Sequence, residues 1–195
     1  MSDLHVPVTD SVMEDGVASD TPKDGEEYQD KFMDLAFNQA REALAAGEVP
    51  IGCVFVTDMG EVIAEGRNEV NLTKNATRHA EMCAVDMVQS KGSTSMYTKL
   101  NVYVNVEPCI MCAAALMKVK VKSIFFGCAN DKFGGCGSVG NLVEILSKLD
   151  TSHKVVMSGG HRASEAVDLL KEFYNGENPN APNPKVKGVR LKKSA

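Results

Sequence analysis

Two short motifs in the sequence combine residue types that bind zinc and move protons. His79-Ala80-Glu81 is an H-x-E motif, and Pro108-Cys109-Ile110-Met111-Cys112 is a P-C-x-x-C motif further along the chain. One imidazole and two thiolates supply three ligands of a tetrahedral zinc, which leaves the fourth position to water. The two motifs together predict one catalytic Zn²⁺ per chain, held by His79, Cys109 and Cys112.

The spacing within each motif predicts where the metal lies relative to the helices. Cys109 and Cys112, three residues apart, share one helix face, and the helix dipole lowers the pKa of thiols in the first turn. His79 and Glu81, two residues apart, diverge by about 200° on the side of a helix. They can face one metal only beyond the helix end. We therefore expect a site that faces two helix N-termini, with Glu81 beside the metal as a proton shuttle.

Other interpretations of these cysteines remain open from the residues alone. A lone C-x-x-C is also typical of a structural zinc site or a redox pair. Cys83 lies four residues after His79 and is the strongest rival ligand, although its apolar neighbours favour a small core side chain. Cys128 and Cys136 flank a glycine-rich loop and could form a second metal pair. Cys53 is interpreted as strand core.

The elements that must position these motifs alternate between helices and strands. After a leading helix and hairpin, the order predicts a mixed sheet of about five strands with helices packed on it, an α/β fold. Helices are expected at 32–44, 79–89, 109–118, 142–149 and 162–174, and strands at 52–57, 62–66, 101–106, 121–127 and 153–157. We expect a disordered acidic leader over 1–26, one catalytic domain over 27–175, and a Pro/Asn linker with a basic tail over 176–195.

The charge is distributed unevenly along the 195 residues, although the net charge is only −5. Residues 1–30 carry nine acidic side chains and one basic one, whereas the end of the chain carries five bases and no acid. A basic tail either improves solubility or binds phosphates. The five basic residues are Lys185, Lys187, Arg190, Lys192 and Lys193.

Composition excludes several classes of protein. With 44% hydrophobic and 24% charged residues, the chain has the mixture of a soluble globular protein. Its apolar runs are shorter than the roughly 18 residues that a membrane helix needs, so no membrane association is expected. The acidic N-terminus lacks the basic and then apolar start of a secretory signal, which predicts a location in the nucleus and/or cytoplasm.

With both motifs in view, the sequence resembles the zinc-dependent nucleoside and nucleobase deaminases. Four segments are similar more specifically to the tRNA adenosine deaminases: 47–53, 66–68, 78–82 and 107–116. The loop 131–138 and the segment 177–182 resemble those of the catalytic subunits of the eukaryotic heterodimeric enzymes. The resemblance covers residues 28–184, which is most of the chain.

The resemblance implies hydrolytic deamination of adenosine to inosine at the wobble position of tRNA anticodons. The enzyme would be a hydrolase of a cyclic amidine C–N bond, with a cytidine-deaminase-like three-layer α/β/α sandwich. In it, a zinc-activated water attacks the base and Glu81 shuttles the protons. The resemblance assigns substrate contacts to Asn68, to the Ala80 backbone N–H, and to a pocket wall formed by Val49, Pro50 and Ile51.

The resemblance also implies partners, which are tRNA and a homologous, catalytically silent deaminase subunit in a heterodimer. The silent subunits lack the glutamate, so Glu81 marks this chain as the active one. Two alternatives use the same residues. A free cytidine, deoxycytidylate or guanine deaminase would not need the basic tail. A non-catalytic zinc module or silent subunit would need neither Glu81 nor an open zinc position.

Overall fold

The computed structural model describes residues 27–92, 94–149 and 152–176. The predicted leader, 1–26, and the basic tail, 185–195, lie outside the described residues. The structural statements that follow concern the described part of the chain.

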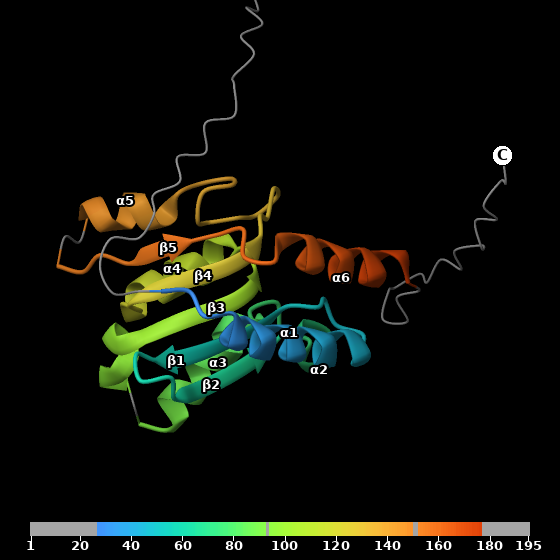
Figure 1. Ribbon diagram of the computed structural model, residues 1–195, viewed down its shortest axis with the longest axis horizontal. Coiled ribbons are helices and arrows are strands. Elements are labelled where there is room, and N and C mark those ends of the chain that lie inside the picture. Colours follow the sequence, from blue (N-terminus) through green and yellow to red (C-terminus); the bar gives the residue numbers. More distant parts are fainter. Residues whose placement is uncertain (1–26, 93, 150–151, 177–195) are drawn as a thin grey trace, which may run out of the picture.

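Five strands form one mixed sheet in the order β2-β1-β3-β4-β5 (Figure 1). β1 is antiparallel to both β2 and β3, whereas β4 is parallel to β3 and to β5. The predicted mixed sheet of five strands is therefore confirmed. The strands are β1 (Gly52–Thr57), β2 (Val62–Arg67), β3 (Leu100–Val106), β4 (Ser123–Cys128) and β5 (Val156–Ser158).

Helices cover both faces of the sheet and produce the three layers that the α/β/α prediction requires. α1 and α6 share one core cluster with the sheet, and α3 and α4 share the other. α5 packs on α4. The α-helices are α1 (Asp30–Ala45), α2 (Val70–Thr73), α3 (Ala80–Ser90), α4 (Ile110–Val119), α5 (Leu142–Leu149) and α6 (Ala163–Asn175), and a 3₁₀ helix spans Thr94–Lys99.

The central strands are buried on both faces, which explains their unbroken apolar sequence. In β1, Cys53 and Phe55 belong to the cluster with α3 and α4, while Val54 and Val56 belong to the cluster with α1. Alternate side chains of a strand point to opposite faces, so a strand between two helical layers needs apolar residues at every position. Burial of these two clusters fixes the sheet against the helices.

Differences from the predicted elements are confined to their ends and to short segments. The helices expected to start at His79 and Cys109 start one residue later, because these two residues adopt extended backbone conformations and cap the helices. The last strand starts at Val156 instead of His153 and pairs with β4 over three residues. The short α2 helix lies in a polar stretch without helical periodicity, so it was not predicted.

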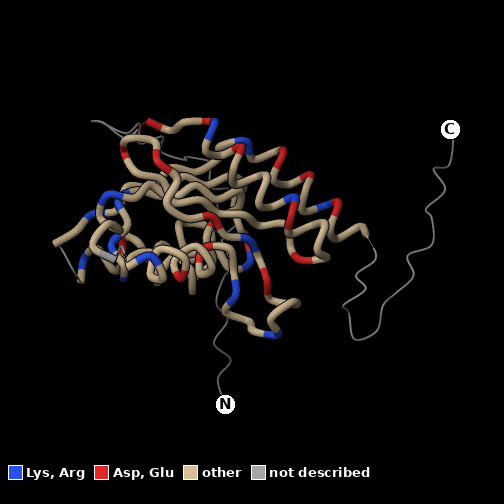
Figure 2. The backbone as a smooth tube through the Cα atoms, turned by 90° about the horizontal axis from the view of Figure 1, so that it is seen from below, with Lys and Arg blue, Asp and Glu red and all other residues tan. Residues whose placement is uncertain are grey.

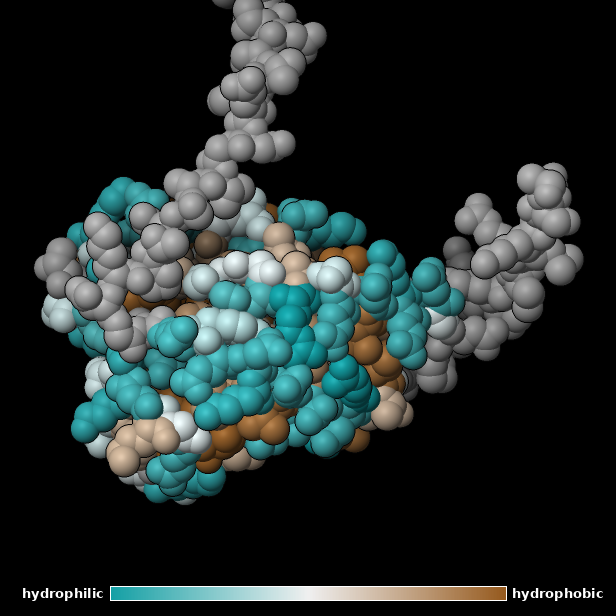
Figure 3. Space-filling model, viewed as in Figure 1, coloured by the Kyte–Doolittle hydropathy of each residue, from teal (hydrophilic) through white to brown (hydrophobic). Residues whose placement is uncertain are grey.

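The surface carries charges of both signs. Figure 2 shows Lys and Arg interspersed with Asp and Glu along the described chain. Hydrophilic residues dominate the face drawn in Figure 3, with smaller hydrophobic areas between them. None of the helices in the described residues combines the length and apolarity that crossing a bilayer requires.

Candidate zinc centre and substrate pocket

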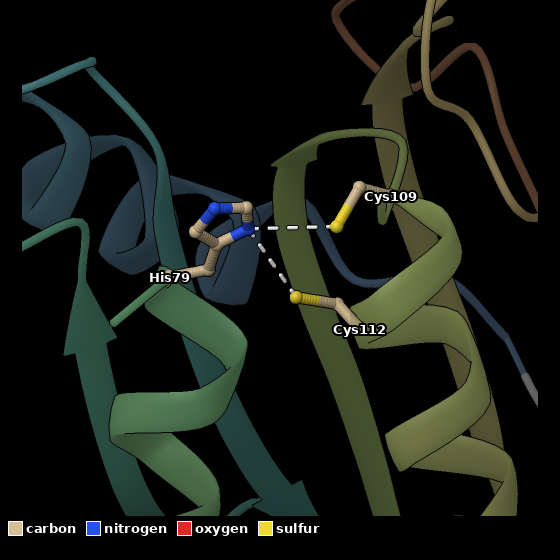
Figure 4. A group of neighbouring side chains, drawn as sticks. All are labelled: His79, Cys109 and Cys112. Carbon is tan, nitrogen blue, oxygen red and sulfur yellow. Dashed lines mark hydrogen bonds between the residues drawn. The ribbon is translucent and has the colours of Figure 1, made fainter. Parts of the chain in front are cut away.

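The three predicted zinc ligands meet where two helices begin. His79 is the N-cap residue of α3, Cys109 is the N-cap residue of α4, and Cys112 lies in the first turn of α4. Figure 4 shows the imidazole of His79 directed at both cysteine sulfurs. The metal site therefore lies beyond the helix ends, as the spacing of His79 and Glu81 requires.

The distances between the ligand atoms fit one tetrahedral zinc. His79 Nδ1 lies 3.4 Å from Cys109 Sγ and 3.6 Å from Cys112 Sγ. With ordinary zinc bond lengths, a nitrogen and a sulfur ligand of tetrahedral zinc are separated by about 3.6 Å. The donor set therefore has the composition and the spacing that zinc needs.

The remaining cysteines take no part in such a group. Among the described residues, His79, Cys109 and Cys112 are the one group of three His, Cys, Asp or Glu side chains close enough to hold a metal. Cys128 and Cys136 are buried but belong to no such group, so a second metal pair finds no support. Cys53 is fully buried as predicted, whereas Cys83 is half-buried beside Arg78 instead of lying in the core.

Hydrogen bonds and helix geometry favour ionisation of one thiol. Hydrogen bonds from Cys112 and His79 lower the pKa of Cys109 to about 4, against the effect of burial. The pKa of the Cys112 thiol is raised by its hydrogen bond with Cys109 and by burial. Zn²⁺ would bind both sulfurs as thiolates, because coordinating thiols are deprotonated.

Glu81 lies in the first turn of α3, next to the three ligands but outside their group. Its side chain is 3% exposed, and burial raises the pKa of its carboxyl group, which interacts with Cys112 and Cys109. A raised pKa makes a carboxylate a stronger proton acceptor, and a positioned carboxyl group can pass the proton on. The position and burial of Glu81 suit a general acid–base.

The predicted pocket wall lies between α1 and β1 and is held from two sides. The buried Asn105 side chain donates to the Pro50 carbonyl and accepts from the Gly52 N–H, both at 2.9 Å. The Asn68 backbone N–H donates to the Ile51 carbonyl at 3.0 Å, which places Asn68 beside the wall. Pro50 is buried and Val49 and Ile51 are half-buried.

The other predicted substrate contact is the backbone of Ala80. Ala80 is buried and is the first residue of α3. The first N–H groups of a helix have no partner within it, so they are able to bind a ligand. Gly66 lets β2 approach this point, because a Cβ there would lie 2.2 Å from the Ala80 carbonyl oxygen.

Three buried polar residues that the sequence motifs did not indicate hold the site together: Glu48, Asn105 and Glu107. Glu107 accepts hydrogen bonds from the backbone N–H groups of Asn130, Cys136 and Ser138, and from the Ser138 hydroxyl. It thereby fixes the glycine-rich loop against the start of α4. An acidic residue directly after a buried strand was a signal that could have been recognised.

Comparison with known proteins identifies the family. Residues 26–128 match the model of the cytidine and deoxycytidylate deaminase zinc-binding region. The chain is 50% identical over 169 residues to tRNA-specific adenosine deaminase 2 of Xenopus tropicalis, covering 83% of this chain and 97% of that one. It is 45% identical over 162 residues to the tRNA-specific adenosine deaminase subunit tad2 of Schizosaccharomyces pombe, covering 83% of this chain and 41% of the relative.

Solved structures agree with these relatives. A chain from a study of A-to-I editing by tRNA:A34 deaminases at the wobble position superposes with a TM-score of 0.64 at 32% identity, covering 72% of this chain and 99% of that one. The guanine deaminase of Nitrosomonas europaea has a TM-score of 0.66 at 21% identity, covering 82% and 91%, and so shares the fold. The chain belongs to the tRNA-specific adenosine deaminases, within the cytidine and deoxycytidylate deaminase zinc-binding family.

Proposed function

We propose that this chain is the catalytic subunit of an enzyme that hydrolyses adenosine to inosine at the wobble position of tRNA anticodons. The observation that carries the proposal is the meeting of His79, Cys109 and Cys112 at two helix starts with the buried carboxyl of Glu81 beside them. A structural zinc site needs no such acid, and a fourth protein ligand would normally close it.

The chain's own residues divide the reaction between them. His79, Cys109 and Cys112 would hold Zn²⁺, which when bound supplies the Lewis acidity that activates water near neutral pH. Glu81 accepts one proton from the attacking water and delivers it to N1 of the purine ring, where it stays in inosine. Glu81 then transfers the second proton of the water, from the new hydroxyl group, to the leaving amine. Adenosine and water thus become inosine and ammonia.

The pocket residues orient the base for this proton transfer. Asn68 and the Ala80 backbone N–H would bind polar edges of the purine, and Val49, Pro50 and Ile51 would contact its faces. An anticodon loop presents unstacked bases, so extracting one into a buried site costs little. The names of the relatives, tRNA-specific adenosine deaminase 2 and tad2, support the same substrate.

We propose that the silent homologous subunit completes the enzyme. The surface where α4 meets α5 supports this, because it contains a cavity of about 590 Å³ that Ala115, Leu146 and the exposed Leu149 help to line. Apolar side chains exposed together around a cavity are typical of interaction surfaces. Leu149→Asp should weaken co-purification of the two subunits without loss of zinc, and unchanged pairing would place the interface elsewhere.

The basic tail, Lys185, Lys187, Arg190, Lys192 and Lys193, is proposed to bind tRNA phosphates. Each phosphate contact releases counterions, so affinity falls with salt and the slope measures the number of contacts. Removing 185–195 should weaken binding and flatten the slope. Equal affinity and slope would indicate a solubility tail instead.

Because zinc thiolates require reduced cysteines, we propose that the enzyme acts in the nucleus and/or cytoplasm.

Sequencing of treated tRNA tests the proposed function directly. Inosine is read as guanosine, so the edited position appears as an A-to-G change. The zinc-loaded chain with its partner should change the wobble position only. Release of ammonia from free cytidine, deoxycytidylate or guanine, with tRNA unchanged, would favour the small-molecule alternative, and no deamination of any of them would favour a non-catalytic zinc module.

A further inference from the structure

We propose that Glu48 is a positioning residue that fixes the orientation of the Asn68 side-chain amide in the substrate pocket. The inference rests on the proposed function, in which Asn68 binds the base. Glu48 lies at the entry to the pocket wall and is 2% exposed, and Asn68 is 4% exposed. Asn68 Nδ2 donates to Glu48 Oε2 at 3.1 Å.

The backbone aims Glu48 into the protein interior. Gly47, with φ of 74°, ends α1, and its N–H donates to the Leu44 carbonyl at 2.9 Å. The Glu48 N–H donates to the Ala43 carbonyl at 2.9 Å. This pair of hydrogen bonds is a Schellman motif, in which glycine takes the left-handed conformation and the next residue turns back against the helix. The direction of Glu48 is therefore set by the end of α1.

Three N–H donors surround the carboxylate of Glu48. Besides Asn68, the Asn71 backbone N–H donates to Oε2 at 3.1 Å and the Leu72 backbone N–H donates to Oε1 at 2.7 Å. These contacts tie the end of α1 to the segment that follows β2. A buried carboxylate is costly unless such donors compensate it. A carboxylate at this position offers its donors acceptors alone, which a neutral amide side chain would not do.

The role follows from the chemistry of amides and carboxylates. An asparagine amide has a donor and an acceptor of similar size, and a half-turn about the last torsion exchanges them. A carboxylate can only accept, so the atom that faces Glu48 has to be Nδ2. The oxygen Oδ1 then faces away from Glu48. The backbone of Asn68 is fixed separately by its hydrogen bond to Ile51. Glu48 thus determines which end of the amide the substrate meets.

Glu48→Gln separates this role from simple support. The two side chains have nearly the same shape, but the glutamine amide offers one oxygen and one NH₂ group. The shortest of the three contacts, 2.7 Å from the Leu72 N–H, favours the oxygen at that position, so the NH₂ group replaces Oε2. Asn68 then turns so that Oδ1 accepts, and the Asn71 N–H loses its acceptor. The side chain at position 48 keeps its size and shape, while the donor and acceptor of Asn68 exchange places. Asn68→Ala removes the group on which Glu48 acts.

A double-mutant cycle with tRNA carrying a wobble adenosine tests the inference. The assays use the zinc-loaded full chain with its partner subunit. We expect Glu48→Gln to lower kcat about tenfold, with KM for tRNA nearly unchanged because phosphate contacts dominate tRNA binding. In the Asn68→Ala background, Glu48→Gln should have no further effect. The inference would be overturned if the two substitutions lowered kcat independently, so that their fold-changes multiply in the double variant. Full activity of either single variant would also overturn it.

Glu107→Gln serves as the matched comparison. It alters a second buried carboxylate that also accepts backbone N–H groups, on the other side of the site. Its effect should multiply with that of Asn68→Ala, because Glu107 has no contact with Asn68 among its hydrogen bonds in the described residues. If both carboxylates show the same coupling to Asn68, the effect of Glu48 is general destabilisation, and the inference fails.

A spectroscopic measurement keeps failure of the inference separate from failure of the proposed function. The Asn68 side-chain NH₂ resonances of the ¹⁵N-labelled zinc-loaded chain should shift in Glu48→Gln and stay unchanged in Glu107→Gln. If the unsubstituted enzyme forms no inosine, the proposed function fails, and a shift restricted to Glu48→Gln still establishes the contact. Identical Asn68 resonances in Glu48→Gln and the unsubstituted chain would overturn the inference.

Discussion

The two helix starts that meet at the zinc centre are held in place by different means. The start of α3 is held by close packing, because β2 passes the Ala80 carbonyl at a point where only Gly66 fits. The start of α4 is held by a buried carboxylate, Glu107, which binds the loop that crosses it. One ligand-bearing helix start is therefore fixed by close packing and the other by hydrogen bonds.

The two means of support suit the backbone around each helix start, which we call the α3 half and the α4 half of the zinc centre. The α3 half carries His79 and Glu81 on one helix next to a regular strand, so steric contact is sufficient. The α4 half has to order an irregular loop, in which a Cβ at Gly134 would lie 2.5 Å from the Glu107 carboxyl group and one at Gly135 would lie 2.7 Å from the Ala113 side chain. Irregular backbone leaves N–H groups without partners, and a buried acceptor satisfies several of them at once.

Loss of the metal should disrupt both halves of the zinc centre, and it should have the largest effect on stability. Cys112→Ser removes one of the ligands that join α3 to α4, and zinc binding is coupled to folding. We expect loss of bound zinc together with low solubility, measured as zinc per chain in the soluble fraction. Cys83→Ala is the matched control and should keep its zinc. An empty site in Cys83→Ala with a full one in Cys112→Ser would show that the ligand set is wrong.

Disruption of the hydrogen-bonded α4 half should have the second-largest effect on stability. In Glu107→Gln an NH₂ group replaces an acceptor oxygen, so buried N–H donors of the loop lose their partner. We expect the free energy of unfolding to fall by about 2–4 kcal/mol, measured by urea denaturation at fixed free zinc. Glu65→Gln is the control, because Glu65 accepts a hydrogen bond from Gln39 in a less buried place. Equal losses in both variants would mean that Glu107 has no special role.

Disruption of the packed half should have the smallest effect of the three. Gly66→Ala forces a methyl group against the Ala80 carbonyl and displaces the start of α3. A loss of about 1–3 kcal/mol in unfolding free energy is expected, as for overpacking elsewhere, with weaker zinc binding. Gly140→Ala is the control, since a Cβ there meets nothing within 4 Å. A Gly66→Ala variant with the stability and zinc affinity of Gly140→Ala would refute the packing argument.

The same comparison explains what could be predicted from the sequence. The zinc ligands and Glu81 were accessible because their spacing is local and depends on helix geometry and ligand chemistry. Glu48, Asn105 and Glu107 were not, because each acts on backbone groups distant in sequence: Leu72 is 24 residues from Glu48, Gly52 is 53 from Asn105, and Cys136 is 29 from Glu107. A backbone N–H carries no residue signature, so its acceptor cannot be identified before the chain is folded.

The fold shows a similar division. The two-sided burial of β1, β3 and β4 gave long apolar runs that predict strands, and the mixed sheet followed from their alternation with helices. The three-residue β5 and the four-residue α2 depend on partners elsewhere in the chain, β4 for the former and Glu48 for the latter. Their positions were therefore set by tertiary contacts and not by local pattern.

The central claim is that Glu81 moves protons beside a zinc that three other residues hold. Glu81→Ala, with its partner subunit, tests it most directly when zinc content and wobble inosine are measured on the same sample. We expect one zinc per chain, as in the unsubstituted protein, and a rate of inosine formation lower by about 10²–10⁴-fold. His79→Ala, by contrast, should lose both. Loss of zinc from Glu81→Ala, or inosine formation at the unsubstituted rate, would contradict the account.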